Sequence, residues 1–128
     1  MNMFSHVMVG SSNIAGSKKF YDALSSSIGG PAATEDENGR LIYMHNDGIF
    51  IVTPPIDGKP ASGANGGTIG IACSSEDQVK AWHAAGVANG GKAIEDPPGI
   101  REGGFGKLYL AYLRDPDGNK LCALHRAG

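Results

Sequence analysis

Hydrophobic and polar residues along the first part of the chain follow the order strand, helix, strand, strand. The stretch HVMVG at 6–10 alternates between the two types, which is the pattern of a strand with one buried face. After the polar SSN, which is typical of a helix start, Phe20, Leu24 and Ile28 recur four residues apart and predict one apolar helix face. The glycines and proline at 29–31 end that helix.

A predicted β-hairpin completes this first unit. The stretches at 40–45 and 49–53 are separated by NDG, a turn composition typical of hairpins. A further strand is expected within 32–38, where the pattern is weaker. The unit therefore has the predicted order βαβββ.

The same order starts again after a linker rich in glycine and proline. A strand is predicted at 68–73, and Ser75 with Gln78 resembles a capping box at the start of a helix. A second hairpin is predicted over 107–124 with DPDG in its turn, and a further strand is expected within 91–98.

The register supports a repeat. Fourteen residues separate His6 from Phe20, and fourteen also separate Thr68 from Trp82. Each pair links the start of a strand to the main aromatic residue of the following helix. Two copies of one unit are the simplest explanation of this spacing.

We therefore expect an α+β fold that forms a single domain over 1–128, with half-repeats at about 1–57 and 66–128. Each βαβββ-like repeat has one apolar sheet face left over after its helix has packed. The two repeats should pair into a curved, cleft-bearing mixed sheet with the helices on its outer face.

Composition and charge exclude several classes of partner. The net charge is −2 and the basic residues are scattered, so neither nucleic acid nor an anionic membrane is expected. Two cysteines are too few for a disulfide scaffold. The sequence shows no secretion signal, and no apolar run approaches the roughly 20 residues of a membrane span. A cytoplasmic location is therefore expected.

Three motifs, in this order, together resemble the vicinal oxygen chelate superfamily of glyoxalase I, the bleomycin-resistance proteins and the extradiol dioxygenases. They are FSHVMVGSSNIAGSKKFYDAL near the start, GGTIGIAC at the head of the second half, and AYLRDPDGNKLCAL at its closing hairpin. The resemblance covers nearly the whole chain. It also implies a homodimer, because related proteins build their clefts where two modules meet, either within one chain or between two.

The resemblance implies four metal-ligand positions, at the first and last strands of each half. Metal-using members typically place His, Glu or Gln, His and Glu there. In this sequence the positions fall on His6, Ile51, Thr68 and Cys122, of which only His6 matches. We therefore predict no metal cofactor, the alternative being one divalent ion. His6 and Cys122 alone would supply two ligands, fewer than the three or four that a stable site needs.

Cys122 has two interpretations at this point. It is either a nucleophile activated by His6 across the cleft or a small apolar residue that fills the space of a lost carboxylate. The sequence PPGIREGGFG at 97–106 is expected to be a loop that can close over the cleft, where Arg101 could meet an anionic substrate.

Strand alternation, combined with these positions, predicts the lining of the cleft. Most of its side chains are apolar, which suits an organic ligand held by packing and a few hydrogen bonds. The predicted cleft residues are His6, Met8, Met44, Ile49, Ile51, Thr68, Leu110, Tyr112 and Cys122.

These features favour a glyoxalase/bleomycin-resistance-like protein with a degenerate metal site that binds a small hydrophobic or amphipathic molecule. One alternative is a metal-dependent lyase, isomerase or dioxygenase of the same superfamily. Another is a structural dimerisation module whose cleft is filled by a partner chain.

Overall fold

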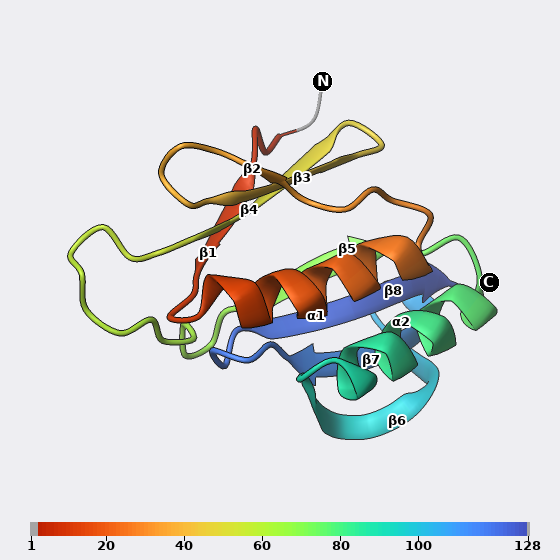
Figure 1. Cartoon of the computed structure of the whole chain (residues 1–128). Coiled ribbons are helices and arrows are strands. Elements are labelled where there is room, and N and C mark those ends of the chain that lie inside the picture. Colours follow the sequence, from red (N-terminus) through yellow and green to blue (C-terminus); the bar gives the residue numbers. More distant parts are fainter. Residues whose placement is uncertain (1–2, 128) are drawn as a thin grey trace.

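The computed structural model describes residues 3–127 and shows the order βαβββ twice (Figure 1). The elements of the first half are β1 (Val7–Gly10), α1 (Ile14–Ser27), β2 (Thr34–Glu35), β3 (Leu41–His45) and β4 (Gly48–Thr53). Those of the second half are β5 (Ile69–Ala72), α2 (Glu76–Ala88), β6 (Lys92–Gly103), β7 (Gly106–Arg114) and β8 (Lys120–Arg126). The predicted α+β class and its two repeats are confirmed.

The strands form two four-stranded mixed sheets. Their orders are β1-β4-β3-β2 and β5-β8-β7-β6, with β1 parallel to β4, β5 parallel to β8, and the other neighbours antiparallel. Within residues 3–127 no strand of one sheet pairs with a strand of the other, so the expected curved sheet is present as two separate sheets in one chain. Strands β1 and β5 each lie at a sheet edge.

Both helices start at side-chain caps, as the sequence predicts. The Asn13 side chain accepts a hydrogen bond from the Gly16 backbone N–H, and the Ser75 hydroxyl accepts one from the Gln78 backbone N–H. These bonds satisfy backbone donors that the first helical turn leaves unpaired. No helix of the described chain is long and apolar enough to cross a membrane.

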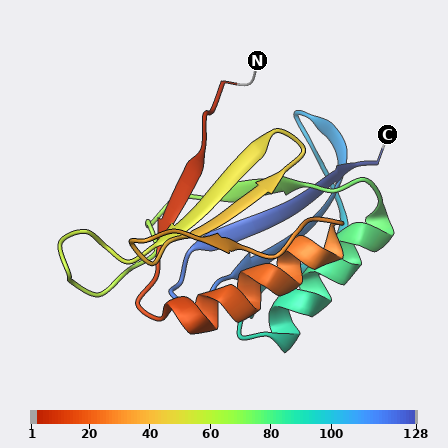
Figure 2. The same cartoon turned by 45° about the horizontal axis from the view of Figure 1, so that its top comes forward.

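Figure 2 shows the two helices side by side. Helix α1 contacts α2 as well as β3 and β4, whereas α2 packs on β6, β7 and β8. A continuous cluster of buried side chains draws on both halves, and its largest fully buried members are Trp82, Phe20, Leu41, Leu113, Leu121, Val52 and Val79. We call the sheet faces toward these helices the helix-side faces, and the opposite faces the open faces.

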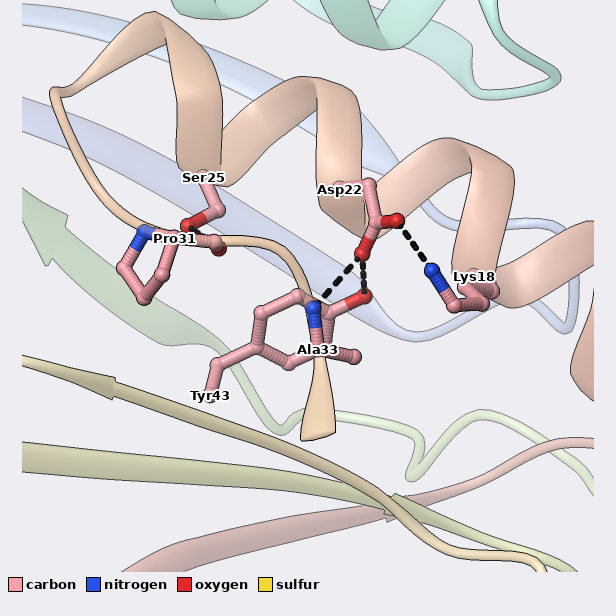
Figure 3. A network of polar contacts seen from close by, with 6 residues as sticks. All are labelled: Lys18, Asp22, Ser25, Pro31, Ala33 and Tyr43. Atoms are coloured by element: carbon pink, nitrogen blue, oxygen red, sulfur yellow. Dashed lines mark hydrogen bonds and ion pairs between the residues drawn. The ribbon is translucent and has the colours of Figure 1, made fainter. Parts of the chain in front are cut away.

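A polar network attaches α1 to the sheet of its own half (Figure 3). The Asp22 carboxylate accepts hydrogen bonds from the Tyr43 hydroxyl at 2.7 Å and from the Ala33 backbone N–H at 3.0 Å, and it pairs with Lys18 at 2.6 Å. Tyr43 lies on β3 and Ala33 on the segment that follows the helix. One carboxylate therefore fixes the helix to both.

The turn between β7 and β8 attaches the second half to the first. Buried Asp115 accepts a 2.5 Å hydrogen bond from the Tyr21 hydroxyl on α1. Asp117 accepts one from the Ser12 backbone N–H at 2.9 Å, and the Asn119 side chain donates to the Gly10 carbonyl at 3.3 Å. The two halves are thus joined within one chain.

The structure corrects the expectation of a free loop at 97–106. Most of this segment belongs to β6, which pairs with β7 from Lys92 to Gly103. Because β6 is an edge strand and its prolines lie in a bulge, the missing proline N–H groups interrupt no central ladder. The strand expected within 91–98 is present and continues to Gly103, and the glycines and prolines concealed that continuation.

Candidate functional site

The open face of the first sheet is apolar and exposed. Met8 lies opposite Ile51, which also pairs with Ile42, and Met44 lies opposite Ile49. The exposed fraction is 44% for Met8 and 63% for Met44. Methionines exposed to this extent on one sheet face mark a surface suited to a ligand or partner.

The open face of the second sheet has a buried apolar floor. Cys122 on β8 lies between Tyr112 of β7 and Gly70 of β5, and Leu110 pairs with Leu124 one rung further along. Leu110 and Cys122 are only 7% and 5% exposed. Alternation along the strands therefore places these predicted cleft residues on one face.

Ile51 and Cys122 occupy corresponding places in the two sheets. Each lies on the strand that pairs with the first strand of its half, opposite Met8 in one sheet and Gly70 in the other. The predicted cleft residues thus form one group on each sheet. Because no strands of the two sheets pair within the part of the chain that the structure describes, the two groups do not lie on one continuous sheet.

His6 and Thr68 lie just outside the strands that they were expected to start. Both are exposed, and the His6 Nδ1 atom is 2.9 Å from the Ser5 hydroxyl. His6 and Ile49 line one hollow together with Phe4 and Asp47. This placement leaves His6 free to contact solvent or a ligand.

The residues at the implied metal positions do not fit a metal centre. Ile51 has no donor atom, and the Thr68 hydroxyl is a poor ligand for the metals that imidazole and carboxylate groups bind. In residues 3–127 no three His, Cys, Asp or Glu side chains lie close enough to hold an ion.

The Cys122 thiol is in an environment that suppresses nucleophilic chemistry. Burial raises its pKa above the ordinary value for cysteine. The thiol therefore stays protonated near neutral pH, and it points to the Ala123 carbonyl at 3.5 Å. This supports the interpretation of Cys122 as an apolar floor residue.

Charged side chains around this floor were not identified as a group from the sequence. The Lys120 ammonium pairs with Glu95 and lies 4.9 Å from the centroid of the Tyr112 ring. Arg101 belongs to the same sheet, where its guanidinium donates to the Gly99 carbonyl at 2.9 Å. The two prolines at 97–98 lie in the bulge of β6 and are its one sequence signal, but they do not show that Glu95 meets Lys120.

A cavity of about 330 Å³ lies on the other side of the sheets, among helix-side residues. Of the predicted cleft residues only Ile49 reaches it. Its walls come from α1, β4 and β5, and its apolar lining includes Leu24, Ile28, Phe50, Ile69 and Ile71. Packing between elements creates this cavity, and no sequence motif indicated it.

Comparisons with known proteins agree with this architecture. The model of the Glyoxalase/Bleomycin resistance protein/Dioxygenase superfamily matches residues 3–123. A crystal structure of a glyoxalase/bleomycin resistance protein from Albidiferax ferrireducens T118 is 55% identical, with a TM-score of 0.94 over 98% of this chain and 100% of that one.

More distant structures share the fold alone. A putative glyoxalase from Bacillus halodurans is 15% identical, with a TM-score of 0.75 over 97% of this chain and 96% of that one. The hypothetical protein SA1046 from S. aureus is also 15% identical, with a TM-score of 0.72 over 97% of this chain and 94% of that one. None of the curated proteins matches the chain.

Proposed function

This chain belongs to the Glyoxalase/Bleomycin resistance protein/Dioxygenase superfamily, and from that premise we propose that it binds a small hydrophobic or amphipathic molecule without a metal ion. The observation that carries the proposal is the exposed apolar open face of the first sheet, with Met8 and Met44 at its surface. A ligand covering this face would remove apolar area from water, which is favourable by about 25 cal/mol per Å².

The proposed cleft combines the open faces of both sheets. The first sheet supplies Met8, Met44, Ile49 and Ile51, with His6 at its end. The second supplies Leu110, Tyr112 and Cys122, with Thr68 at its end. A binding cleft typically offers such an apolar lining with few polar groups.

A homodimer is part of the proposal. Strands β1 and β5 are sheet edges, and among residues 3–127 their outer backbone N–H and C=O groups pair with no strand of the other sheet. Such edges are templates for pairing with another chain. In a dimer, the first sheet of one copy would face the second sheet of its partner, and the cleft would close between them.

The metal-free part of the proposal is supported by the donor set. Ile51 and Thr68 cannot replace the carboxylate and imidazole that a divalent ion needs. The alternative, a metal-dependent lyase, isomerase or dioxygenase, requires ligands from elsewhere. We also propose a reducing, cytoplasmic setting, in keeping with the two free cysteines.

The experiment titrates the neutral fluorescent dye phenylnaphthylamine into the protein, using Met8→Glu as the cleft variant. Ile56→Glu is the matched control, because Ile56 is an exposed hydrophobic residue that lies outside the strands. We expect Met8→Glu to weaken dye binding by roughly tenfold, through the charge placed on an apolar surface, and Ile56→Glu to change it less than about twofold. Equal effects of the two variants on dye binding would exclude the proposed cleft as the binding site.

Sedimentation tests whether the protein is a homodimer, and a monomer at micromolar concentration would contradict that part of the proposal.

Titration of Zn²⁺, Ni²⁺, Mn²⁺ and Fe²⁺ into chelated protein tests whether the protein binds a metal ion. One stoichiometric ion per chain would favour the alternative of a metal-dependent enzyme.

The variant Ile71→Phe tests the helix-side cavity as the binding site. Dye binding that changes with Ile71→Phe, but not with Met8→Glu, would place the ligand in that cavity instead.

A further inference from the structure

The charged side chains beside Cys122 form an arrangement that apolar binding does not use. Lys120 at the start of β8 pairs with Glu95 of β6, and its ammonium lies over the Tyr112 ring. The Lys120 side chain is 25% exposed and that of Glu95 is 46% exposed. The pair therefore lies at the border between the apolar floor and solvent.

The backbone of Glu95 has a conformation that side-chain-bearing residues rarely adopt. Its φ is +59°, in the left-handed region, at a place where the register of β6 against β7 shifts between Ile94 and Gly99. Non-glycine residues are kept in this region only when the surrounding structure imposes it, and such residues gather at functional sites. The bulge directs the Glu95 carboxylate to Lys120.

Arg101 supports the bulge from the same strand. Its guanidinium donates to the carbonyls of Asp96 at 3.0 Å, Pro97 at 3.2 Å and Gly99 at 2.9 Å. All of these acceptors are neutral, and in the described part of the chain no carboxylate lies within 4.0 Å of the guanidinium. Glu95 thus neutralises Lys120, whereas the positive charge of Arg101 has no carboxylate partner among the described residues.

We propose that Lys120 anchors the anionic head group of an amphipathic ligand, and that Glu95 occupies the place of that anion in the free protein. This inference rests on the proposed function, because the apolar part of the same ligand would lie in the proposed cleft between the open faces. The Tyr112 hydroxyl is a second donor on this face. The ligand class is an apolar ring system or chain that carries one carboxylate or chemically similar anionic group.

Ligand binding would exchange one anion for another at Lys120. The displaced Glu95 carboxylate is already half exposed and can be hydrated, and its backbone is then free to leave the left-handed conformation. The remaining charge of Arg101 favours an anion over a neutral group by Coulomb attraction. A charge-assisted hydrogen bond fixes the orientation of the head group.

The experiment compares two dyes with the same aromatic system, neutral phenylnaphthylamine and anionic anilinonaphthalene sulfonate. We expect Lys120→Gln to weaken the anionic dye by roughly tenfold and the neutral dye by less than about twofold. Glu95→Gln removes the internal competitor and should strengthen the anionic dye by roughly fivefold, with the neutral dye unchanged. Lys107→Gln is the matched control, because Lys107 is an exposed lysine on β7 near Glu102.

The outcomes separate this inference from the proposed function. If the neutral dye fails to bind, the proposed function is wrong. If the neutral dye binds normally and Lys120→Gln does not change binding of the anionic dye, Lys120 is not the anchor of an anionic head group. Weaker binding of the anionic dye to Glu95→Gln would show that Glu95 positions Lys120 rather than competes for it. It would contradict the claim that the ligand anion replaces Glu95 at Lys120. Circular dichroism melts of each variant verify that the fold is intact.

Discussion

The two halves of this chain share the order βαβββ but place their polar side chains on opposite sides of their sheets. On the helix side of the first half, the buried hydroxyls of Ser11 and Ser17 form a 2.6 Å hydrogen bond. Sixty-two residues later the corresponding positions are Cys73 and Val79, both buried and apolar. On the open faces the order is reversed, because the first sheet exposes methionines and the second carries the Lys120 ion pair.

The helices show the same contrast. Asp22 of α1 corresponds to Ala84 of α2, so only the first helix is held to its sheet by a carboxylate. Leu24 corresponds to Gly86, and the two meet, since a Cβ on Gly86 would lie 3.2 Å from the Leu24 side chain. The first half thus holds its helix to the sheet through hydrogen bonds, and the second half holds its helix by close packing.

The largest expected effect concerns two turns of similar geometry, one in each half. Asp115 accepts from the backbone N–H groups of Asp117 and Asn119, just as Asp36 accepts from those of Asn38 and Arg40. Only Asp115 is buried and bound to Tyr21, 2.5 Å away. We expect Asp115→Ala to lower the free energy of unfolding by about 3 kcal/mol, because it leaves the buried Tyr21 hydroxyl without its acceptor.

Urea denaturation measures this difference, with Asp36→Ala as the control. That variant should cost about 1 kcal/mol or less, because its turn is partly exposed to water. Tyr21→Phe removes the donating hydroxyl and leaves no unpaired polar group on residue 21, so it should lower the free energy of unfolding by about 1 kcal/mol. Equal losses for the two aspartates would contradict the assignment of the second turn as the attachment between halves.

The next largest effect tests the packing of Leu24 against Gly86. An added Cβ at Gly86 would come within 2.3 Å of the Leu113 side chain, so Gly86→Ala forces the helix or the leucine to move. We expect a loss of about 1–3 kcal/mol, despite the better helix propensity of alanine. Thermal denaturation gives the value, and Gly103→Ala, where nothing lies within 4 Å of the added atom, is the control.

The sequence predicted the fold because its signals are local. Alternation, caps and the turn residues indicated both repeats, and Ile51 and Cys122, which the resemblance singled out, lie at corresponding places in the two sheets. The missed features depend on distant pairs. The continuation of β6 beyond residue 98 depends on its hydrogen bonds to β7, and Glu95 meets Lys120 because of a bulge in that strand. The separation of the two sheets is set by packing, which no local pattern records.

A smaller effect is expected from moving the apolar pair of the second half into the first. Ser17→Val alone leaves the buried Ser11 hydroxyl without its 2.6 Å partner and should cost about 2 kcal/mol. The double variant Ser11→Cys with Ser17→Val introduces the apolar pair that the second half has at these positions, and it should recover about 1 kcal/mol of that loss. A double-mutant cycle by urea denaturation measures the coupling, and purely additive losses would show that the two positions are independent.

The smallest effect is a pH dependence that the Asp22 carboxylate of the first half should produce. Burial alone would raise the pKa of Asp22, but the hydrogen bonds from Lys18, Ala33 and Tyr43 outweigh it and hold the pKa below its ordinary value. A lowered folded-state pKa stabilises the fold above the ordinary pKa of an aspartate, and this contribution is lost as the pH falls through the folded-state pKa.

Asp22→Asn should therefore cost about 1 kcal/mol at pH 7 and progressively less as the pH falls below 4, because the wild-type carboxylate itself becomes protonated there. Urea denaturation at a series of pH values measures the gap between the two proteins. Tyr43→Phe removes one donor to Asp22 and should narrow the pH-dependent part without abolishing it, since Lys18 and the Ala33 N–H remain. A gap between wild type and Asp22→Asn that stays constant down to pH 2 would mean that the Asp22 charge does not help to hold α1, and that the first half attaches its helix by packing, as the second half does.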